Sequence, residues 1–198
     1  MSLGTLLLTA AFAQNVILVH FLGPWPFPVL LASLRRSVTF SLGITGALVW
    51  VSTVYALLFH LVLRPYSLEF MATFVLLTVL AFSYLLWTRI AVTVYPFSAR
   101  AIGRAMPVIF LNTTVFVVPM ALAEAVEPFW FIPLTALAAG AGLFLAVVPV
   151  AAFYEHLSTA RLPRVISGNV IILLATALFA LALYQLDVLL ATAAYPLW

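Results

Sequence analysis

The sequence of 198 residues contains neither cysteine nor lysine. Without cysteine, disulfides, thiolate metal sites and thiol chemistry are excluded, because each of them needs a cysteine sulfur. Without lysine, the 8 basic side chains other than histidine are all arginines. The formal net charge of +3 therefore gives no sign of nucleic-acid binding, and we expect no nucleic-acid partner. The arginine positions are better interpreted as signals of membrane topology.

Charged residues are scarce as well. They make up 7% of the chain, whereas 67% of the residues are hydrophobic and the mean hydropathy is +1.28. Soluble domains usually contain about 45–50% apolar residues, so the composition predicts an integral membrane protein surrounded by the lipid bilayer. The sequence has no HExxH motif, no phosphate-binding loop and no glycine-rich dinucleotide turn. We therefore predict no catalytic residue and no metal site within this chain.

Long apolar windows indicate the number of membrane spans. About 20 apolar residues are needed to cross ~30 Å of hydrocarbon. Six windows are long enough, at about 3–22, 37–60, 68–88, 105–123, 129–153 and 166–186. The pattern predicts an all-α integral membrane fold, with six transmembrane helices in a single domain over residues 1–198.

The arginines divide unevenly between the two sides of such a protein. When alternate connections are assigned to one side, the arginines on that side are Arg35, Arg36, Arg89, Arg100, Arg104, Arg161 and Arg164. The other side has Arg64 and the acidic residues Glu69, Glu124, Glu127 and Asp187. By the positive-inside rule, the arginine-rich side is cytoplasmic. We expect a multi-pass protein of the bacterial inner membrane with both termini outside, in the periplasm.

An internal repeat relates the two halves of the chain. A shift of 97 residues places Asn15 on Asn112 and Gly43 on Gly140. The halves, about 1–95 and 98–190, begin on opposite sides of the membrane, so they are predicted to be inverted three-helix repeats. Inverted repeats are typical of transporters, where the working site lies near the membrane midplane.

Asn15 and Asn112 are the first candidate site residues, because each lies deep in an apolar window. In a functional interpretation, both asparagines mark a midplane site where helices break and polar groups, including Thr113 and Thr114, line an ion path. In a structural interpretation, the amides form interhelical hydrogen bonds that hold the spans together. The sequence does not decide between these two interpretations.

A second candidate lies in the predicted cytoplasmic loop, where Glu155 is followed by His156. A carboxylate beside an imidazole can relay protons. However, neighbouring residues do not face each other on a helix, which favours a solvated position at the helix end. The predicted spans contain no acidic residue or lysine near their centres, so an obvious carboxylate relay for protons or Na⁺ is missing.

Three segments together resemble a known family. They are NVILVHFLGPWPFP from Asn15, MPVIFLNTTVFV from Met106, and EHLSTARLPRVISGNVIILL from Glu155, which includes Gly168 and Asn169. They are similar to the Rnf/Nqr integral membrane subunits, most of all to the RnfA/NqrE-like branch. The resemblance implies six inverted-repeat spans in a subunit of an electron-transport and ion-translocating complex, with other integral membrane subunits as partners in a hetero-oligomer.

This sequence departs from the family pattern at the two positions that hold the metal cluster in the family. By resemblance, the family has one cysteine in each half, and two such subunits together hold an iron–sulfur cluster within the membrane. The equivalent positions here are Trp25 and Thr113, and neither side chain can bind iron as a thiolate does. The broken-helix corner of Gly23, Pro24 and Pro26 is retained around Trp25. The resemblance also implies a glutamate at the position of Thr88.

These observations leave three hypotheses for the function. The chain is a cysteine-less Rnf/Nqr-type subunit of a bioenergetic complex, without its own iron–sulfur cluster and at most a non-catalytic part of an oxidoreductase. Alternatively, it is a non-redox accessory subunit of another photosynthetic or respiratory assembly, or a stand-alone inverted-repeat transporter. Because the chain has no cysteine, we expect no cofactor that is held by cysteine ligands. The sequence does not decide whether the chain contacts a quinone, a pigment or a lipid.

Overall fold

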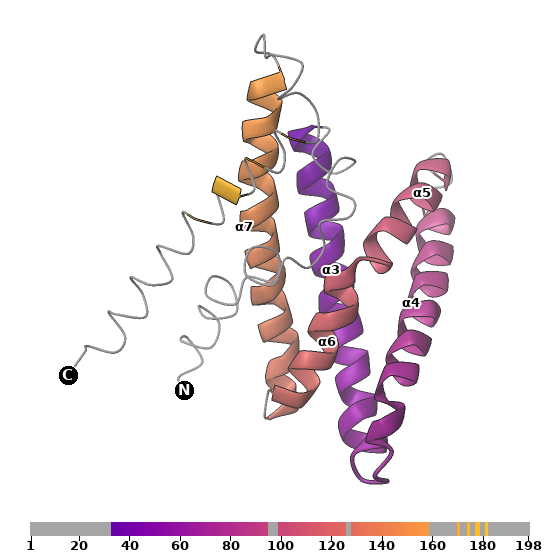
Figure 1. Cartoon of the computed structure of the whole chain (residues 1–198). Helices are drawn as coiled ribbons and strands as arrows, with labels where there is room; N and C mark the ends of the chain where they lie inside the picture. The colour runs from indigo at the N-terminus through magenta and orange to yellow at the C-terminus, as the bar shows by residue number, and fades with distance from the viewer. Residues whose placement is uncertain are drawn as a thin grey trace, which may run out of the picture.

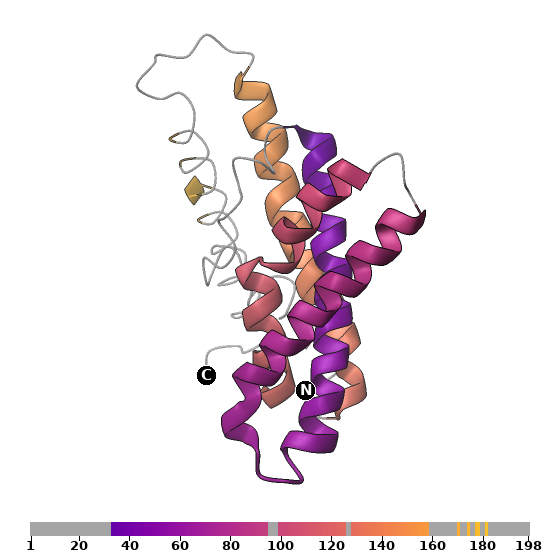
Figure 2. The same cartoon turned by 90° about the vertical axis from the view of Figure 1, so that its right-hand side faces the viewer.

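The computed structural model describes residues 33–94, 99–125 and 128–158, together with the single positions 170, 174, 177, 178 and 181. Within these residues every regular element is helical. The long helices run up and down in alternating directions, and α3 lies between α7 and α4 (Figure 1). The view in Figure 2 shows the same helices turned by 90°, with α4 crossing in front of the bundle. The predicted windows 3–22 and 166–186 lie outside the described residues, apart from the single positions named above.

The first long helix, α3 (Leu34–Leu58), begins at a polar cap and ends in a wider turn. The side chain of Ser33 accepts a hydrogen bond from the backbone N–H of Arg36, which satisfies one of the free donors of the first turn. A π-helical turn, η2 (Phe59–Leu63), extends the helix without a break in direction. The chain then turns at Ser67, which has a positive φ of 55°.

The return helix and its successors complete the described part. The short 3₁₀ turn η3 (Glu69–Met71) leads into α4 (Ala72–Val94). Two shorter helices follow, α5 (Ala99–Phe110) and α6 (Thr113–Ala125). The 3₁₀ turn η5 (Phe129–Phe131) then leads into α7 (Ile132–Ser158).

Three described helices are long and apolar enough to cross a membrane: Leu34–Leu63, Glu69–Val94 and Ile132–His156. They agree with the predicted windows 37–60, 68–88 and 129–153; the first helix extends beyond its window at both ends, and the other two extend only at their C-terminal ends. The window 105–123 is not one straight helix, because its two halves meet at a bend of 40°. Counted as one broken span, the pair makes a fourth. The chain is thus a multi-pass membrane protein.

The core is built along α3, whose most extensive interface is with α7. At its centre Thr45 Oγ1 donates to the backbone carbonyl of Gly140 at 3.2 Å. A Cβ at Gly140 would overlap the Thr45 side chain, so glycine allows the two backbones to approach. On the other side of α3, Trp50 donates from Nε1 to Ser83 Oγ of α4 at 3.1 Å.

The described charges follow the predicted segregation between the two ends of the bundle. Arg35 and Arg36 lie in the first turn of α3, at the same end as Arg89 near the end of α4 and Arg104 near the start of α5. The opposite end has Arg64, Glu69 and Glu124. The described charges therefore differ in net sign between the two ends, as expected for helices that cross a membrane, although Glu155 near the end of α7 lies at the arginine-rich end.

Candidate functional site

The fourth predicted span breaks at Leu111 and Asn112, between α5 and α6. Pro107 lies inside α5 and has no backbone N–H, so one hydrogen bond of the helix is missing just before the break. Asn112 then starts the second helix: its Oδ1 accepts from the backbone N–H of Thr114 at 2.8 Å. Its carbonyl oxygen also accepts from Val115 at 3.0 Å. Asparagine is among the preferred residues at such an N-cap, and the local sequence explains why a new helix begins here.

The three polar residues at the break differ in their exposure. Asn112 is 3% exposed and Thr114 is fully buried, whereas the side chain of Thr113 is exposed. The oxygen of Asn112 is used by the cap of its own helix. Its amide nitrogen, in contrast, forms no hydrogen bond with any part of the chain that the structure describes. This nitrogen is nevertheless not among the buried side-chain atoms of the described residues that lack a partner.

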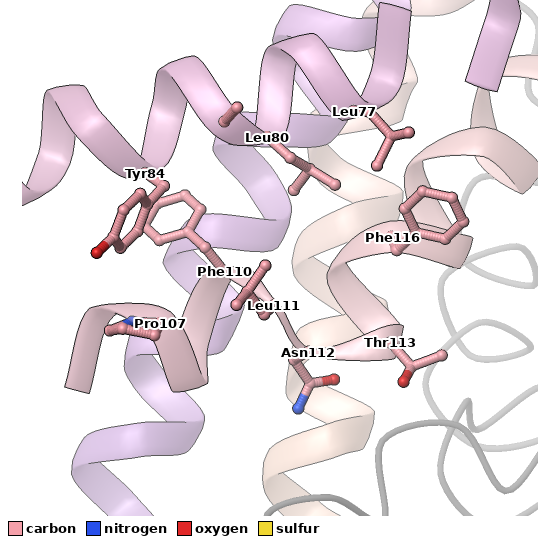
Figure 3. Close-up of a pocket in the computed structure, with 10 residues that line it drawn as sticks. Leu77, Leu80, Tyr84, Pro107, Phe110, Leu111, Asn112, Thr113 and Phe116 are labelled. Atoms are coloured by element: carbon pink, nitrogen blue, oxygen red, sulfur yellow. The ribbon is translucent and has the colours of Figure 1, made fainter. Parts of the chain in front are cut away.

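A cavity of about 550 Å³ lies beside the break. One wall is α4 and the other is the broken pair α5 and α6 (Figure 3). Its lining residues are Leu77, Leu80, Ala81, Tyr84, Pro107, Phe110, Leu111, Asn112, Thr113 and Phe116. The bend separates α5 from α6 on one side, and the space this leaves is not filled by the side chains of α4.

The polar groups of this cavity lie at its ends. Figure 3 shows the amide of Asn112 and the hydroxyl of Thr113 together at one end, away from Leu77 and Leu80. The hydroxyl of Tyr84 points outward at the other end. The Tyr84 ring meets Phe110 edge to face, with 6.4 Å between ring centroids. The middle of the cavity is thus apolar.

The sequence identifies Asn112 and Thr113 but misses the other walls of this cavity, and the third predicted residue, Thr114, is buried and does not line it. Pro107 followed by an asparagine and two threonines is a recognisable stop-and-start signal for a helix. The apolar residues of α4 carry no such signal. In the sequence, these residues cannot be distinguished from residues that face the lipid. The bend between α5 and α6 shows that they line a cavity.

The structure gives Glu155 a contact that the sequence does not indicate. Its Oε2 accepts a hydrogen bond from the backbone N–H of Leu34 at 2.8 Å. The carboxylate at the end of α7 thus caps the start of α3, where a negative charge interacts favourably with the helix dipole. The side chains of both Glu155 and His156 are exposed.

Two further groups of positions were singled out by the family pattern. Thr88, where the resemblance implies a glutamate, is half-buried, and its hydroxyl has no hydrogen-bond partner among the described residues. The remaining predicted site residues lie outside the described residues and stay predictions: Asn15, Gly23, Pro24, Trp25, Pro26, Gly168 and Asn169.

The family relationship can be tested against known proteins. A family model described as "Rnf-Nqr subunit, membrane protein" matches residues 3–190. The chain belongs to the Rnf-Nqr subunit family. The match covers nearly the whole chain, and the family is one of membrane proteins, in agreement with the apolar helices and with the resemblance found in the sequence.

Individual members of the family are similar to this chain along most of their length. The A-subunit of the ion-translocating oxidoreductase complex of Ectopseudomonas mendocina is 30% identical over 179 residues, covering 89% of this chain and 92% of that protein. The A-subunit of the Na⁺-translocating ferredoxin:NAD⁺ oxidoreductase complex of Acetobacterium woodii is 26% identical, with 92% and 95% covered. Its counterpart from the proton-translocating complex of Clostridium ljungdahlii is 26% identical, with 90% and 92% covered.

The residues of this Rnf-Nqr family member do not fit the iron–sulfur cluster that the resemblance implies. Such clusters are held by cysteine thiolates, with histidine replacing some of them in certain types. The chain has no cysteine, and at the break it offers the hydroxyl of Thr113. No group of three or more histidine, aspartate or glutamate side chains that could hold a metal occurs in the described residues either.

Proposed function

We propose that this chain is an integral membrane subunit of an ion-translocating oxidoreductase complex, and that it works there without an iron–sulfur cluster of its own. The observation that carries the proposal is the extent of the similarity. Relatives named as the A-subunit of such complexes are covered to 92–95% of their length, and this chain to 89–92%. Two proteins that shared only their fold, and not their place in a complex, would not need to match in sequence over so much of their length.

The proposal assigns the chain a role in packing and in the ion path. Its partners are other integral membrane subunits of a hetero-oligomer in the bacterial inner membrane. Asn112, Thr113 and Thr114, together with Asn15 of the first half, are proposed to form polar positions near the midplane. Support comes from the broken helix at Asn112, because irregular backbone at membrane depth is tolerated only where protein or a cavity surrounds it.

The proposed architecture has six spans in two inverted repeats, about 1–95 and 98–190, with both termini in the periplasm. Two features support it. The helices α3 and α7 correspond under the shift of 97 residues, and they pack against each other in opposite directions. The described arginines also gather at one end of the bundle, with the exception of Arg64.

Copurification tests the assembly. The chain, tagged at its chromosomal locus, is extracted in a mild detergent, and the proteins bound to it are identified by mass spectrometry; the untagged strain is the control. We expect the other components of a redox complex, among them a second member of this family. A chain that elutes alone as a monomer would contradict the proposal.

The loss of the cluster ligands favours one alternative, a non-redox accessory role in another photosynthetic or respiratory assembly. A scaffold that keeps its fold but has no metal ligand fits a packing role. The same experiment separates the two functions, because copurification with pigment proteins or with unrelated respiratory proteins would replace the first proposal by this one.

A further inference from the structure

A second hollow, an apolar groove between α3, α4 and α5, lies in the half of the bundle nearest the arginine-rich end. Its volume is about 240 Å³, its floor is formed by Gly43 and Gly46 of α3, and its walls are Trp87 of α4 and Met106 and Ile109 of α5. The helix α5 diverges from α3 toward the arginine-rich end (Figure 1). No charged side chain lines the groove, and membership in a complex does not account for it.

The glycines leave the groove open, and it is as deep as one leaflet of the membrane. A Cβ at Gly46 would meet nothing within 4 Å, and Leu42, which also lines the groove, is 59% exposed. Gly43 and Gly46 follow Arg36 by seven and ten residues. At 1.5 Å per residue these separations are about 10 and 15 Å along α3. Because the hydrocarbon core is ~30 Å thick, the groove extends from the membrane surface to about the midplane.

Two arginines lie on the face of α3 that forms the groove. Arg35 and Arg36 each precede a groove residue, Leu42 or Gly43, by seven positions, and residues with this spacing share one face of a helix. Both arginines are exposed, and neither guanidinium has an ion-pair partner among the residues that the structure describes. The carboxylate at this end, that of Glu155, accepts from a backbone N–H of α3 instead.

We propose that this groove binds one acyl chain of an anionic phospholipid, whose phosphate headgroup contacts Arg35 and Arg36. Charge complementarity selects this occupant, because basic pockets between transmembrane helices are typical binding sites of anionic lipid headgroups. The volume of about 240 Å³ is below the ~300–1,000 Å³ usual for small-molecule sites, and it suits a linear chain. The site requires neither electron transfer nor the assembly proposed above, since all of its walls belong to this chain.

Two other arginines at the same end of the bundle distinguish this site from a general attraction of anionic lipid. Arg89 and Arg104 are each two residues from a wall residue, Trp87 or Met106. Two residues correspond to a rotation of about 200° around a helix, so both arginines lie on helix faces that point away from the groove. A general attraction would involve all four arginines, whereas the proposed site involves only those of α3.

A titration with two matched lipids tests the preference for an anionic headgroup. The full chain in dodecyl maltoside is titrated with dioleoylphosphatidylglycerol and with dioleoylphosphatidylcholine, which have the same acyl chains, and native mass spectrometry counts the bound lipids. We expect one saturable site that binds phosphatidylglycerol at least about fivefold tighter, which is the contribution of a single arginine near a membrane surface. Equal affinities, as expected if a helix of another subunit covers the groove instead of lipid, would overturn the proposal.

Two double variants with the same change in charge locate the headgroup. Arg35→Gln with Arg36→Gln is expected to remove the preference for phosphatidylglycerol, so that the two lipids bind with affinities within about twofold of each other. Arg89→Gln with Arg104→Gln should keep the preference of the wild type. Thermal unfolding without added lipid verifies that both variants are folded. An equal loss of preference in the two double variants would show a general charge effect and refute the site.

Substitutions within the groove locate the acyl chain. Gly46→Phe fills the groove from α3 and Met106→Trp fills it from α5, and we expect each of them to weaken phosphatidylglycerol at least about fivefold. Leu57→Phe adds a ring at an exposed position of α3 that does not line the groove, and it should bind as the wild type does. Unchanged binding to either groove variant that folds would place the lipid elsewhere and contradict the proposal.

The lipid bound in the cell is identified by extraction. The wild type and Gly46→Phe are purified from native membranes, and the phospholipids bound to each are quantified by mass spectrometry. An anionic phospholipid that is enriched with the wild type and lost from Gly46→Phe supports the site and identifies the headgroup. The same phospholipids in equal amounts with both proteins would refute it. Because copurifying proteins are not measured, this result is independent of the complex.

Discussion

The side chain of Asn112 caps the start of α6, and we expect its oxygen to contribute to stability. The oxygen accepts from the backbone N–H of Thr114 at the start of α6. Asn112→Ala removes this cap, and we expect a loss of about 1 kcal/mol in the free energy of unfolding. Thermal unfolding of the purified protein measures it. The control is Thr113→Ala, at an exposed neighbouring position, which should change the midpoint little; an equally small effect of Asn112→Ala would show that the cap is unimportant.

Tyr55 is a second residue whose polar group can be tested alone. Its side chain is fully buried in the core, and its hydroxyl has no hydrogen-bond partner among the described residues. Removing an unsatisfied buried hydroxyl while keeping the ring should leave stability unchanged or raise it by up to about 1 kcal/mol. Tyr55→Phe is therefore expected to unfold at the same or a higher temperature. A clear decrease would instead reveal a bound water or another partner at this hydroxyl.

Between elements, the contact of α3 with α7 depends on the absence of a side chain at Gly140. A Cβ there would overlap Thr45, which is stiff because it is β-branched and which is held by hydrogen bonds to the carbonyls of Ser41 and Gly140. Gly140→Ala is expected to cost about 1–3 kcal/mol through overpacking. Gly46→Ala in α3 is the matched control, because a Cβ at Gly46 meets nothing within 4 Å. Similar unfolding midpoints for the two variants would contradict the close packing.

A second contact between elements joins the end of α7 to the start of α3. Glu155→Ala removes the acceptor for the N–H of Leu34, whereas Glu155→Gln keeps an oxygen acceptor and removes the charge. We expect the unfolding temperature to decrease in the order wild type, Gln, Ala. The difference between wild type and Gln should shrink at high salt, because the interaction of the charge with the helix dipole is screened. A salt-independent difference would argue against that interaction.

At this scale the hydropathy of the sequence predicts which segments are helices but not how these helices end or bend. The windows 37–60, 68–88 and 129–153 are recognisable because burial in lipid requires continuous apolar runs. The bend at Asn112 is not predictable within 105–123 from hydropathy, because apolar content is the same in a straight and in a broken span. The contact of Glu155 with Leu34 joins residues 121 positions apart, and no local pattern encodes such a pairing. The same holds for the walls that α4 adds to the cavity.

The family of the whole molecule is accessible from sequence because three separate motifs and their order are retained. The loss of the cluster ligands is accessible too, since zero cysteines is a statement about composition and needs no coordinates. The arrangement of the first half around Trp25 and Asn15 stays a prediction. At the break this chain has the hydroxyl of Thr113 where the resemblance implies a thiol, next to the asparagine that the family pattern shares.

The absence of cysteine also makes the topology of the whole molecule directly measurable, because any introduced cysteine is a unique label. Tyr66 lies 72% exposed in the turn before α4, and His156 is exposed near the end of α7. We expect a membrane-impermeant maleimide to label Tyr66→Cys in cells whose outer membrane has been permeabilised, since this turn faces the periplasm in the proposed orientation. His156→Cys should react only after the inner membrane is also opened. The cysteine-free parent controls for background, and labelling in the reverse order would show that the arginine-rich end is outside, contrary to the positive-inside rule on which the orientation rests.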